Sequence, residues 1–257
     1  MANLRIFVDV VKTFQNWPTH LLDHFKLLPP GQIRYRMRNG ARFQVRAGTL
    51  DSMVLREIWV RDDYTPEGFE IPRDAIVLDV GGHVGAFAVR ASRMAPRGKV
   101  YVFEPTPQNF ALLRQNIELN HASNVTTFNL ALLGHAGSRQ ITLCDDQVSH
   151  SLFGGSPDRK RLEVQGISLA DFMKQENLSR IDFMKMDCEG AEFEILQECP
   201  DEVLCRIQKL AAELHDLDEQ RNRRMLAEFL KSKGFQIIAD PHKEHMLYAK
   251  RPPAPKP

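Results

Sequence analysis

The chain has 257 residues, of which 43% are hydrophobic and 26% are charged, and its formal net charge is +1. This length suits one large α/β domain with a short extra segment, and the near-neutral balance shows neither a global basic excess for nucleic acid nor an acidic tail. No stretch approaches the roughly 20 apolar residues of a membrane span, and the N-terminus has no signal-peptide pattern. None of the four cysteines forms a CxxC pair, so we expect reduced thiols and a cytoplasmic protein.

The first 70 residues predict an extension built from helices and a β-hairpin. Leu4 to Leu28 has the pattern of a helical piece that ends at Pro29-Pro30-Gly31. Ile33 to Arg46 alternates roughly apolar and polar residues around Asn39-Gly40, which is typical of a hairpin with a tight turn. Asp51 to Val60 then predicts a helix. The apolar face of the first helix would pack on the protein's own sheet or form a homodimer interface, and the sequence leaves the oligomeric state open.

Residues 71–251 predict one α/β domain, because strands and helices alternate along them. Strands are expected at Ala75–Val80, Lys99–Phe103, Val125–Leu132, Ile181–Met186 and Lys209–Leu214, with an extra strand at Gln140–Cys144. Helices are expected at Val84–Met94, Pro107–Asn120, Leu169–Glu176, Ala191–Glu198 and Glu219–Lys231. This alternation predicts a mostly parallel sheet with right-handed crossovers. Residues 252–257 are rich in proline and predict a flexible tail.

The last two predicted strands form a hairpin at the end of the domain. Phe235–Ala239 and His245–Lys250 are separated by a short polar stretch without a helix. A parallel connection needs a dozen or more residues, so these two strands must pair antiparallel. A mostly parallel, seven-stranded sheet that ends in an antiparallel hairpin is unusual for dehydrogenases and is the ending expected of Rossmann-like methyltransferases.

A glycine-containing loop follows the first strand of the domain and opens a helix. It reads Asp-x-Gly-x-x-x-Gly over Asp79, Gly81 and Gly85, so it lacks the GxGxxG pattern that holds a dinucleotide pyrophosphate. S-adenosylmethionine has no phosphate but has a cationic amino-acid end, which Asp79 suits, and the open turn at Gly81 lets that end approach the backbone. Glu104 closes the second strand 25 residues after Asp79, the spacing at which an acid reaches ribose hydroxyls in such folds.

From about Arg36 to Ala249 these residues resemble the FkbM-type methyltransferases. Residues 78–85 (LDVGGHVG) look like the family's LDVGANVG loop, and residues 184–192 (MKMDCEGAE) look like its KxDxEGxE segment. The second strand and helix and the positions after the third strand are also similar. His83 stands where the family usually has asparagine, and histidine can likewise donate a hydrogen bond to a carboxylate.

The resemblance implies a class I methyltransferase fold with S-adenosylmethionine as its cofactor. It also implies O-methylation of a hydroxyl on a sugar, a polyketide or another small secondary metabolite. The near-neutral charge leads us to expect no nucleic-acid partner, and a divalent metal is possible but not expected. The loop and the resemblance together predict these cofactor-binding residues: Asp79, Gly81, Gly82, His83, Gly85, Glu104, Asn129, Ala131 and Asp187.

Acceptor chemistry is expected where two neighbouring strands end, because ligands of this fold lie at the carboxyl ends of the strands. Asp187 follows one strand, and Glu213 and His215 end the next. A hydroxyl acceptor must lose its proton, so Asp187 or His215 is a candidate general base. Alternatively, Asp187, Glu213 and His215 bind a metal that orients the acceptor. In a third interpretation Asp187 and Glu189 cap the next helix, and Lys185 is expected to pair with an acid.

Three other functions remain as alternatives at this stage. A nicotinamide-dependent oxidoreductase is disfavoured by the missing GxGxxG motif and by the terminal hairpin. A nucleic-acid methyltransferase is disfavoured by the near-neutral charge. A non-catalytic relic that binds the cofactor without turnover is disfavoured by the intact loop and acids. Trp59 and Tyr64 are candidates to cover the cofactor, although core packing is the simpler account of Trp59.

Overall fold

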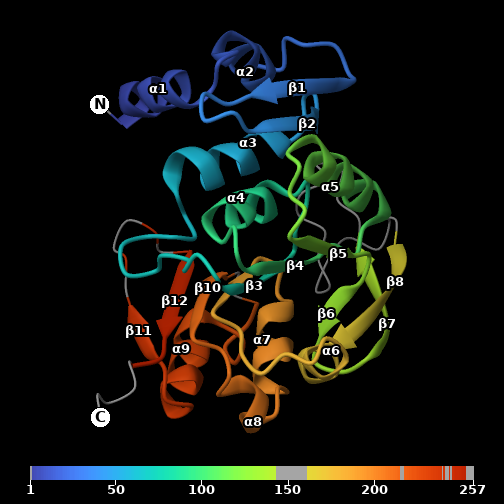
Figure 1. Ribbon diagram of the computed structural model, residues 1–257, viewed down its shortest axis with the longest axis vertical. Coiled ribbons are helices and arrows are strands. Elements are labelled where there is room, and N and C mark those ends of the chain that lie inside the picture. The colour runs from blue at the N-terminus through green and yellow to red at the C-terminus, as the bar shows by residue number, and fades with distance from the viewer. Residues whose placement is uncertain are drawn as a thin grey trace.

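The centre of the molecule is a seven-stranded sheet (Figure 1). The computed structural model describes residues 2–142, 161–214, 217–238, 240, 243 and 245–252. In spatial order the strands are β11 (Gln236–Ile238), β12 (Met246–Lys250), β10 (Lys209–Glu213), β9 (Phe183–Met186), β3 (Ile76–Val80), β4 (Lys99–Phe103) and β5 (Val125–Phe128). β12 is antiparallel to β10 and β11, whereas the pairs from β10 to β5 are parallel. The predicted α/β fold is confirmed, with β12 inserted between β10 and the edge strand β11.

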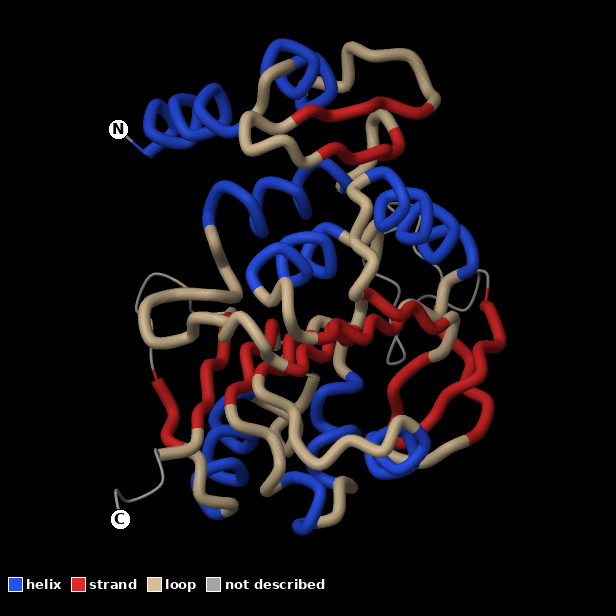
Figure 2. The backbone as a smooth tube through the Cα atoms, in the orientation of Figure 1, coloured by secondary structure: helices blue, strands red, loops and turns tan. Residues whose placement is uncertain are grey.

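Helices cover both faces of this sheet (Figure 2). One face carries α3 (Asp51–Arg56), α4 (Ala86–Met94) and α5 (Pro107–Leu119), and the other carries α6 (Leu169–Gln175), α7 (Ala191–Gln197), α8 (Asp201–Leu204) and α9 (Arg223–Ser232). Successive side chains of a strand point to opposite faces, so Val77 of β3 joins the apolar cluster on the first face and Leu78 joins the second. None of the described helices is long and apolar enough to cross a membrane.

The N-terminal segment forms two helices, α1 (Ala2–Thr13) and α2 (Trp17–His24), where one helical piece was predicted. The interruption has a local cause, because Phe14 leaves α1 to form a β-bridge with Met37, and α2 starts again with Pro18 in its first turn. Val10 and Phe14 belong to the same apolar cluster as α4 and β3. This segment therefore packs over the helices of the first face, with α1 against the turn that follows α3 and α2 against α3 (Figure 1).

The predicted hairpin is confirmed as β1 (Gln32–Arg36) paired with β2 (Arg42–Arg46). Its inward side chains Tyr35 and Phe43 are fully buried in the first-face cluster. The helix predicted from residue 51 is α3 followed by a π-helical turn, η1 (Glu57–Arg61). Asp62 ends it with a left-handed φ of 54°, and the chain then carries Tyr64 to the carboxyl ends of the strands.

The strand predicted over residues 125–132 is two strands in different sheets. β5 stops at Phe128, and β6 (Ala131–Leu133) joins β8 (Arg161–Ser168) and β7 (Gly137–Thr142) in a separate three-stranded sheet. Asn129 marks the break, because its side-chain amide donates to the carbonyl oxygens of Glu104 and Pro105 at 2.9 and 3.0 Å. β7 covers the start of the extra strand predicted at 140–144, whose last two residues lie outside the described residues. β8 was not predicted.

Candidate active site

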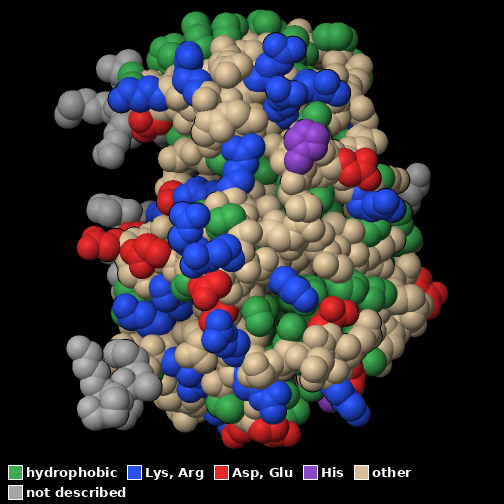
Figure 3. All heavy atoms as spheres, viewed as in Figure 1, with side chains coloured by type: hydrophobic (Ala, Val, Ile, Leu, Met, Phe, Trp, Pro, Cys, Tyr) green, Lys and Arg blue, Asp and Glu red, His purple; other side chains and the backbone are tan. Residues whose placement is uncertain are grey.

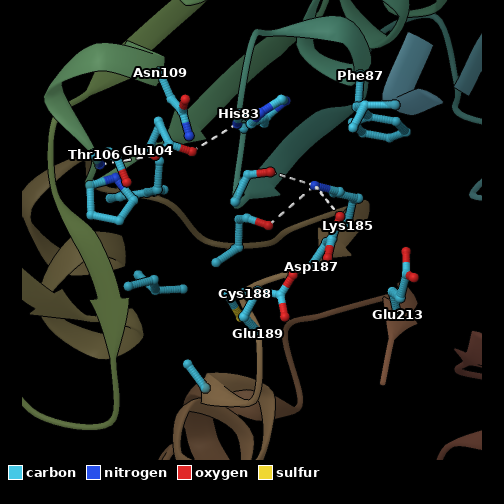
Figure 4. A pocket seen from close by; sticks show the side chains of 18 of the residues that line it. His83, Phe87, Glu104, Thr106, Asn109, Lys185, Asp187, Cys188, Glu189 and Glu213 are labelled. Atoms are coloured by element: carbon cyan, nitrogen blue, oxygen red, sulfur yellow. Dashed lines mark hydrogen bonds and ion pairs between the residues drawn. The ribbon is translucent and has the colours of Figure 1, made fainter. Parts of the chain in front are cut away.

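A cavity lies at the carboxyl ends of β3, β4, β9 and β10, and Figure 4 shows it from close by. Its polar lining includes the backbone of residues 81–83, the side chains that follow β4 and β9, and the acids of η1 and β10. Its lining residues are Leu50, Met53, Val54, Glu57, Ile58, Tyr64, Val80, Gly81, Gly82, His83, Phe87, Phe103, Glu104, Pro105, Thr106, Asn109, Ala131, Leu132, Ile141, Lys185, Asp187, Cys188, Glu189, Ala191 and Glu213. The fold thus brings most of the predicted site residues to one cavity.

Glu104 is held rigidly at the wall of this cavity (Figure 4). Its Oε2 accepts a hydrogen bond from the backbone N–H of His83 at 2.8 Å, and its Oε1 accepts one from the N–H of Thr106 at 2.9 Å. The residue is only 4% exposed, and this burial raises the pKa of Glu104 to about 7 against the opposing effect of the two N–H donors. Each carboxylate oxygen has a second lone pair, so the group can still accept hydrogen bonds from ligand hydroxyls.

The glycines of the loop serve contacts within the protein. A Cβ on Gly81, whose φ is +80°, would lie 1.8 Å from the carbonyl oxygen of Asp187. A Cβ on Gly82 would lie 2.2 Å from a methyl of Val102, and Gly85 packs against Leu113 with a φ of +81°. The N–H groups of Gly81 and Gly82 both donate to the carbonyl oxygen that ends β4. The loop therefore ties the ends of β3, β4 and β9 together around the cavity.

Gly81→Ala is expected to destabilise the fold by ~2–5 kcal/mol, because it combines left-handed backbone strain with overlap on the Asp187 carbonyl. At about 2–4 °C per kcal/mol for a chain of this size, thermal unfolding would shift by several degrees. Gly40→Ala is the matched control, because Gly40 has a φ of +85° but nothing within 4 Å of an added Cβ. Equal melting temperatures of the two variants would contradict the close approach at Gly81.

Asp79 lies behind the loop rather than at the cavity surface. Its side chain is fully buried, and its Oδ1 is 3.3 Å from the Lys185 ammonium. Burial raises the pKa of Asp79 to about 6 although Lys185 opposes the shift. Lys185 also donates to the carbonyl oxygen of Gly81 at 2.6 Å, and it lines the cavity. The predicted pairing of Lys185 with an acid is confirmed, and Asp79 thereby contacts a side chain that itself lines the cavity.

Lys185 remains a cation in this buried position. Burial alone would lower the pKa of Lys185, but the carboxylates of Asp79 and Asp187 outweigh it and raise the pKa above its usual value. Its ammonium is 3.7 Å from Asp187 Oδ2 and 5.3 Å from the centre of the Tyr64 ring. One fixed positive charge thus neutralises part of the negative charge on this side of the cavity.

Tyr64 connects the ends of β9 and β10. Its hydroxyl lies 3.0 Å from Asp187 Oδ2 and 3.1 Å from Glu213 Oε2, so it can donate to either carboxylate. Glu57 of η1 lies near the same two carboxylates. Burial raises the pKa of Glu57 to about 7, and the negative charges of Glu213 and Asp187 add to this shift. The sequence did not identify Glu57 and treated Tyr64 only as a cover. The one sequence feature that could have indicated both residues is their position in the segment that leads into the first strand of the domain.

His83 adopts a left-handed φ of 47° and faces the N-terminal segment. Its Nε2 lies 3.3 Å from Asp51 Oδ1 and 3.3 Å from Nη2 of Arg46. Burial alone would raise the pKa of Asp51, but hydrogen bonds from Arg46 and the charge of His83 lower it below its usual value. His83 thus contributes its backbone N–H to Glu104 and its ring to a polar contact that joins the hairpin to the loop.

The remaining predicted site residues have different positions. Ala131 lines the cavity, whereas Asn129 supports it from outside by holding the segment after β4. His215 lies outside the described residues. The loop after β9 is capped by Glu192, whose carboxylate accepts from the N–H groups of Cys188 and Gly190 at 2.7 and 2.8 Å. Asp187 and Glu189 had been candidates for that role.

Two further expectations concern metal and aromatic residues. Within the part of the chain that the structure describes, no group of three or more His, Cys, Asp or Glu side chains is arranged to hold a metal ion. Trp59 donates its ring N–H to the carbonyl oxygen of Ala86 at 3.2 Å and packs against Phe43. It does not line the cavity, so core packing accounts for it, whereas Tyr64 does line it.

The chain is similar to a known protein family and to several known proteins. A family model described as the methyltransferase FkbM domain matches residues 79–237. The 31-O-demethyl-FK506 methyltransferase FkbM of Streptomyces tacrolimicus is 28% identical over 236 residues, which cover 80% of this chain and 89% of that protein. Methyltransferase 1 of Beauveria bassiana is 27% identical over 225 residues, covering 77% and 89%. A crystal structure of methyltransferase FkbM from Methylobacillus flagellatus is 16% identical with a TM-score of 0.48, covering 77% of this chain and 51% of that one.

Proposed function

The chain belongs to the FkbM methyltransferase family, and from this premise we propose that it transfers the methyl group of S-adenosylmethionine to a hydroxyl of a small secondary metabolite. The observation that carries the proposal is the arrangement of two carboxylates on one cavity, Glu104 after β4 and Asp187 after β9. The name of the Streptomyces relative, a 31-O-demethyl-FK506 methyltransferase, supports an oxygen acceptor in a natural product.

The residues of the cavity fit the cofactor. The rigid, buried carboxylate of Glu104 suits the two ribose hydroxyls, and the apolar side chains of Phe103, Leu132 and Ile141 suit the flat adenine ring. Glu189 and residues 81–83 of the glycine loop also line the cavity, and we assign this part of it to the charged amino-acid end. When bound, S-adenosylmethionine supplies an electrophilic methyl group on a sulfonium, so much of the catalysis comes from holding the acceptor in line with it.

Asp187 is our assignment for the general base. It follows β9 directly, lines the cavity, and is 30% exposed, so an acceptor can reach it. Tyr64 and Lys185 both contact Oδ2, which fixes the carboxylate and leaves Oδ1 as the atom assigned to take the hydroxyl proton. Removing this proton as the new bond forms keeps the oxygen nucleophilic. We assign Glu213 to orienting Tyr64, and with it Asp187.

Calorimetric titration of the chain with S-adenosylmethionine and S-adenosylhomocysteine tests this function. We expect both to bind in the micromolar range, and we expect a hydroxyl-bearing acceptor found by screening to be methylated equally well with Mg²⁺ or with EDTA. Failure of both compounds to bind would remove the basis for the proposal. If EDTA abolished turnover, the interpretation in which Asp187 and Glu213 bind a metal would be favoured. Cofactor binding without turnover of any hydroxyl acceptor would favour a non-catalytic relic.

A further inference from the structure

The β1–β2 hairpin carries positive charge that the methyl-transfer site does not use. Between Asp23 and Asp51 the chain has five arginines and one lysine but no carboxylate side chain, whereas the whole chain has a net charge of only +1. Figure 3 shows Lys and Arg side chains gathered over this hairpin. The positive charge is therefore concentrated on the hairpin, and such a concentration attracts ligands of negative charge.

The strand register brings these arginines together on the outer face of the hairpin. Tyr35 and Phe43 point inward and are fully buried, so the alternate positions Arg34, Arg36 and Arg42 point outward and are exposed. Arg36 lies directly opposite Arg42 in the antiparallel pairing. Like charges at directly opposite positions destabilise a hairpin, so this pair costs stability unless an anion lies between the two guanidinium groups.

The three outward arginines surround one hollow at the turn end of the hairpin. The residues that line it are Gln15, Arg34, Arg36, Met37, Gly40, Ala41 and Arg42. Within the described part of the chain, no carboxylate lies within ion-pair distance of these three arginines, and the guanidinium of Arg34 donates to the side-chain oxygen of Gln44 at 3.4 Å. Arg46, at the other end of β2, differs because it is paired with Asp51 at 2.7 Å. The hollow therefore holds concentrated positive charge.

We propose that this hollow binds a small phosphorylated ligand through one or two of its phosphate groups. Guanidinium groups match phosphate oxygens with paired N–H donors, and Arg36 and Arg42 are neighbours on the outer face of the hairpin and both line the hollow. Three arginines around one hollow match a ligand with one or two phosphate groups, whereas a nucleic acid needs a longer basic track to neutralise successive phosphates. The site is separate from the methyl-transfer cavity, with which its lining shares no residue.

The test uses inorganic pyrophosphate as the probe and the full chain as the protein. We expect saturable binding with a stoichiometry of one, weakened by added salt. The double variant R36Q/R42Q is expected to bind pyrophosphate at least about tenfold more weakly, because two charge-assisted contacts are lost. R224Q is the matched control, since Arg224 is 86% exposed, lies on α9 and pairs with Glu228, and its pyrophosphate affinity should equal that of the unsubstituted chain.

Two further readouts keep the result interpretable. R36Q/R42Q should melt at the same temperature as the unsubstituted chain or higher, because the repulsion is removed, and its affinity for S-adenosylhomocysteine should be unchanged. The proposal would be overturned if the unsubstituted chain did not bind pyrophosphate, or if R36Q/R42Q bound it as tightly as the unsubstituted chain. So would a single-stranded RNA that binds much more tightly than pyrophosphate and competes for the same arginines, since the surface would then be a nucleic-acid site.

Discussion

Glu104→Ala is expected to weaken the binding of S-adenosylmethionine at least about 100-fold, because two charge-assisted hydrogen bonds to ribose are lost at ~1.5 kcal/mol or more each. The substitution also removes the acceptor of the His83 and Thr106 N–H groups, so the end of the loop loses its anchor. Calorimetry with S-adenosylhomocysteine measures the loss without turnover. Glu118→Ala is the control, because Glu118 is 73% exposed on the neighbouring helix α5.

The pH dependence of binding gives the same assignment a second test. Burial raises the pKa of Glu104 to about 7 in the free protein, and the ionised carboxylate is the form that accepts two ribose hydroxyls. Lowering the pH from 8 to 6 therefore protonates Glu104 and should weaken cofactor binding, whereas raising the pH above 8 should have little further effect. Glu104→Gln should bind weakly and lose this pH dependence. A Glu104→Gln variant that retained both affinity and pH dependence would move the ribose contact to another residue.

The parts of this protein that sequence predicts best are those with a strong local pattern. The five parallel strands of the main sheet alternate with helices, and the glycine loop after β3 has a specific spacing, so both could be located before the structure was known. Glu104 was found by its distance along the chain from Asp79, and the structure places it on the cavity wall with its oxygens fixed. Each of these predictions depends on residues that lie near one another in sequence.

The features that sequence could not show depend on contacts between distant segments. Asp79 was predicted to bind the cofactor from its place at the end of β3, and the structure adds that its carboxylate contacts Lys185, 106 residues later. Gly81 was predicted from the local motif to let a ligand approach the backbone, and the structure adds that a Cβ there would overlap the carbonyl oxygen of Asp187. Glu57 lines the same cavity as Asp187 and Glu213, although η1 lies more than 100 residues before β9 and β10 in the sequence. The local pattern of the sequence does not reveal such contacts between distant segments.

Asp187→Asn is expected to lower kcat by about 10²–10⁴-fold, the range associated with a general base. Affinity for S-adenosylhomocysteine should change by less than about threefold, because asparagine keeps the shape of the side chain and the backbone carbonyl that faces Gly81. Tyr64→Phe should lower kcat by a smaller factor, about tenfold, since it removes only the hydroxyl that orients the carboxylate. Single-turnover kinetics with a radiolabelled methyl donor separates these effects from product release.

A base differs from a structural carboxylate in how its loss depends on the acceptor. If Asp187 removes the hydroxyl proton, the defect of Asp187→Asn should shrink as the acceptor hydroxyl becomes more acidic, because a phenol needs less assistance than an alcohol. A purely structural role would give the same defect for both acceptors. Asp187→Asn with near-normal kcat on an alcohol would eliminate Asp187 as the base, and His215→Ala would then be the decisive variant. A constant defect accompanied by weaker cofactor binding would instead assign Asp187 to holding the loop between β9 and α7.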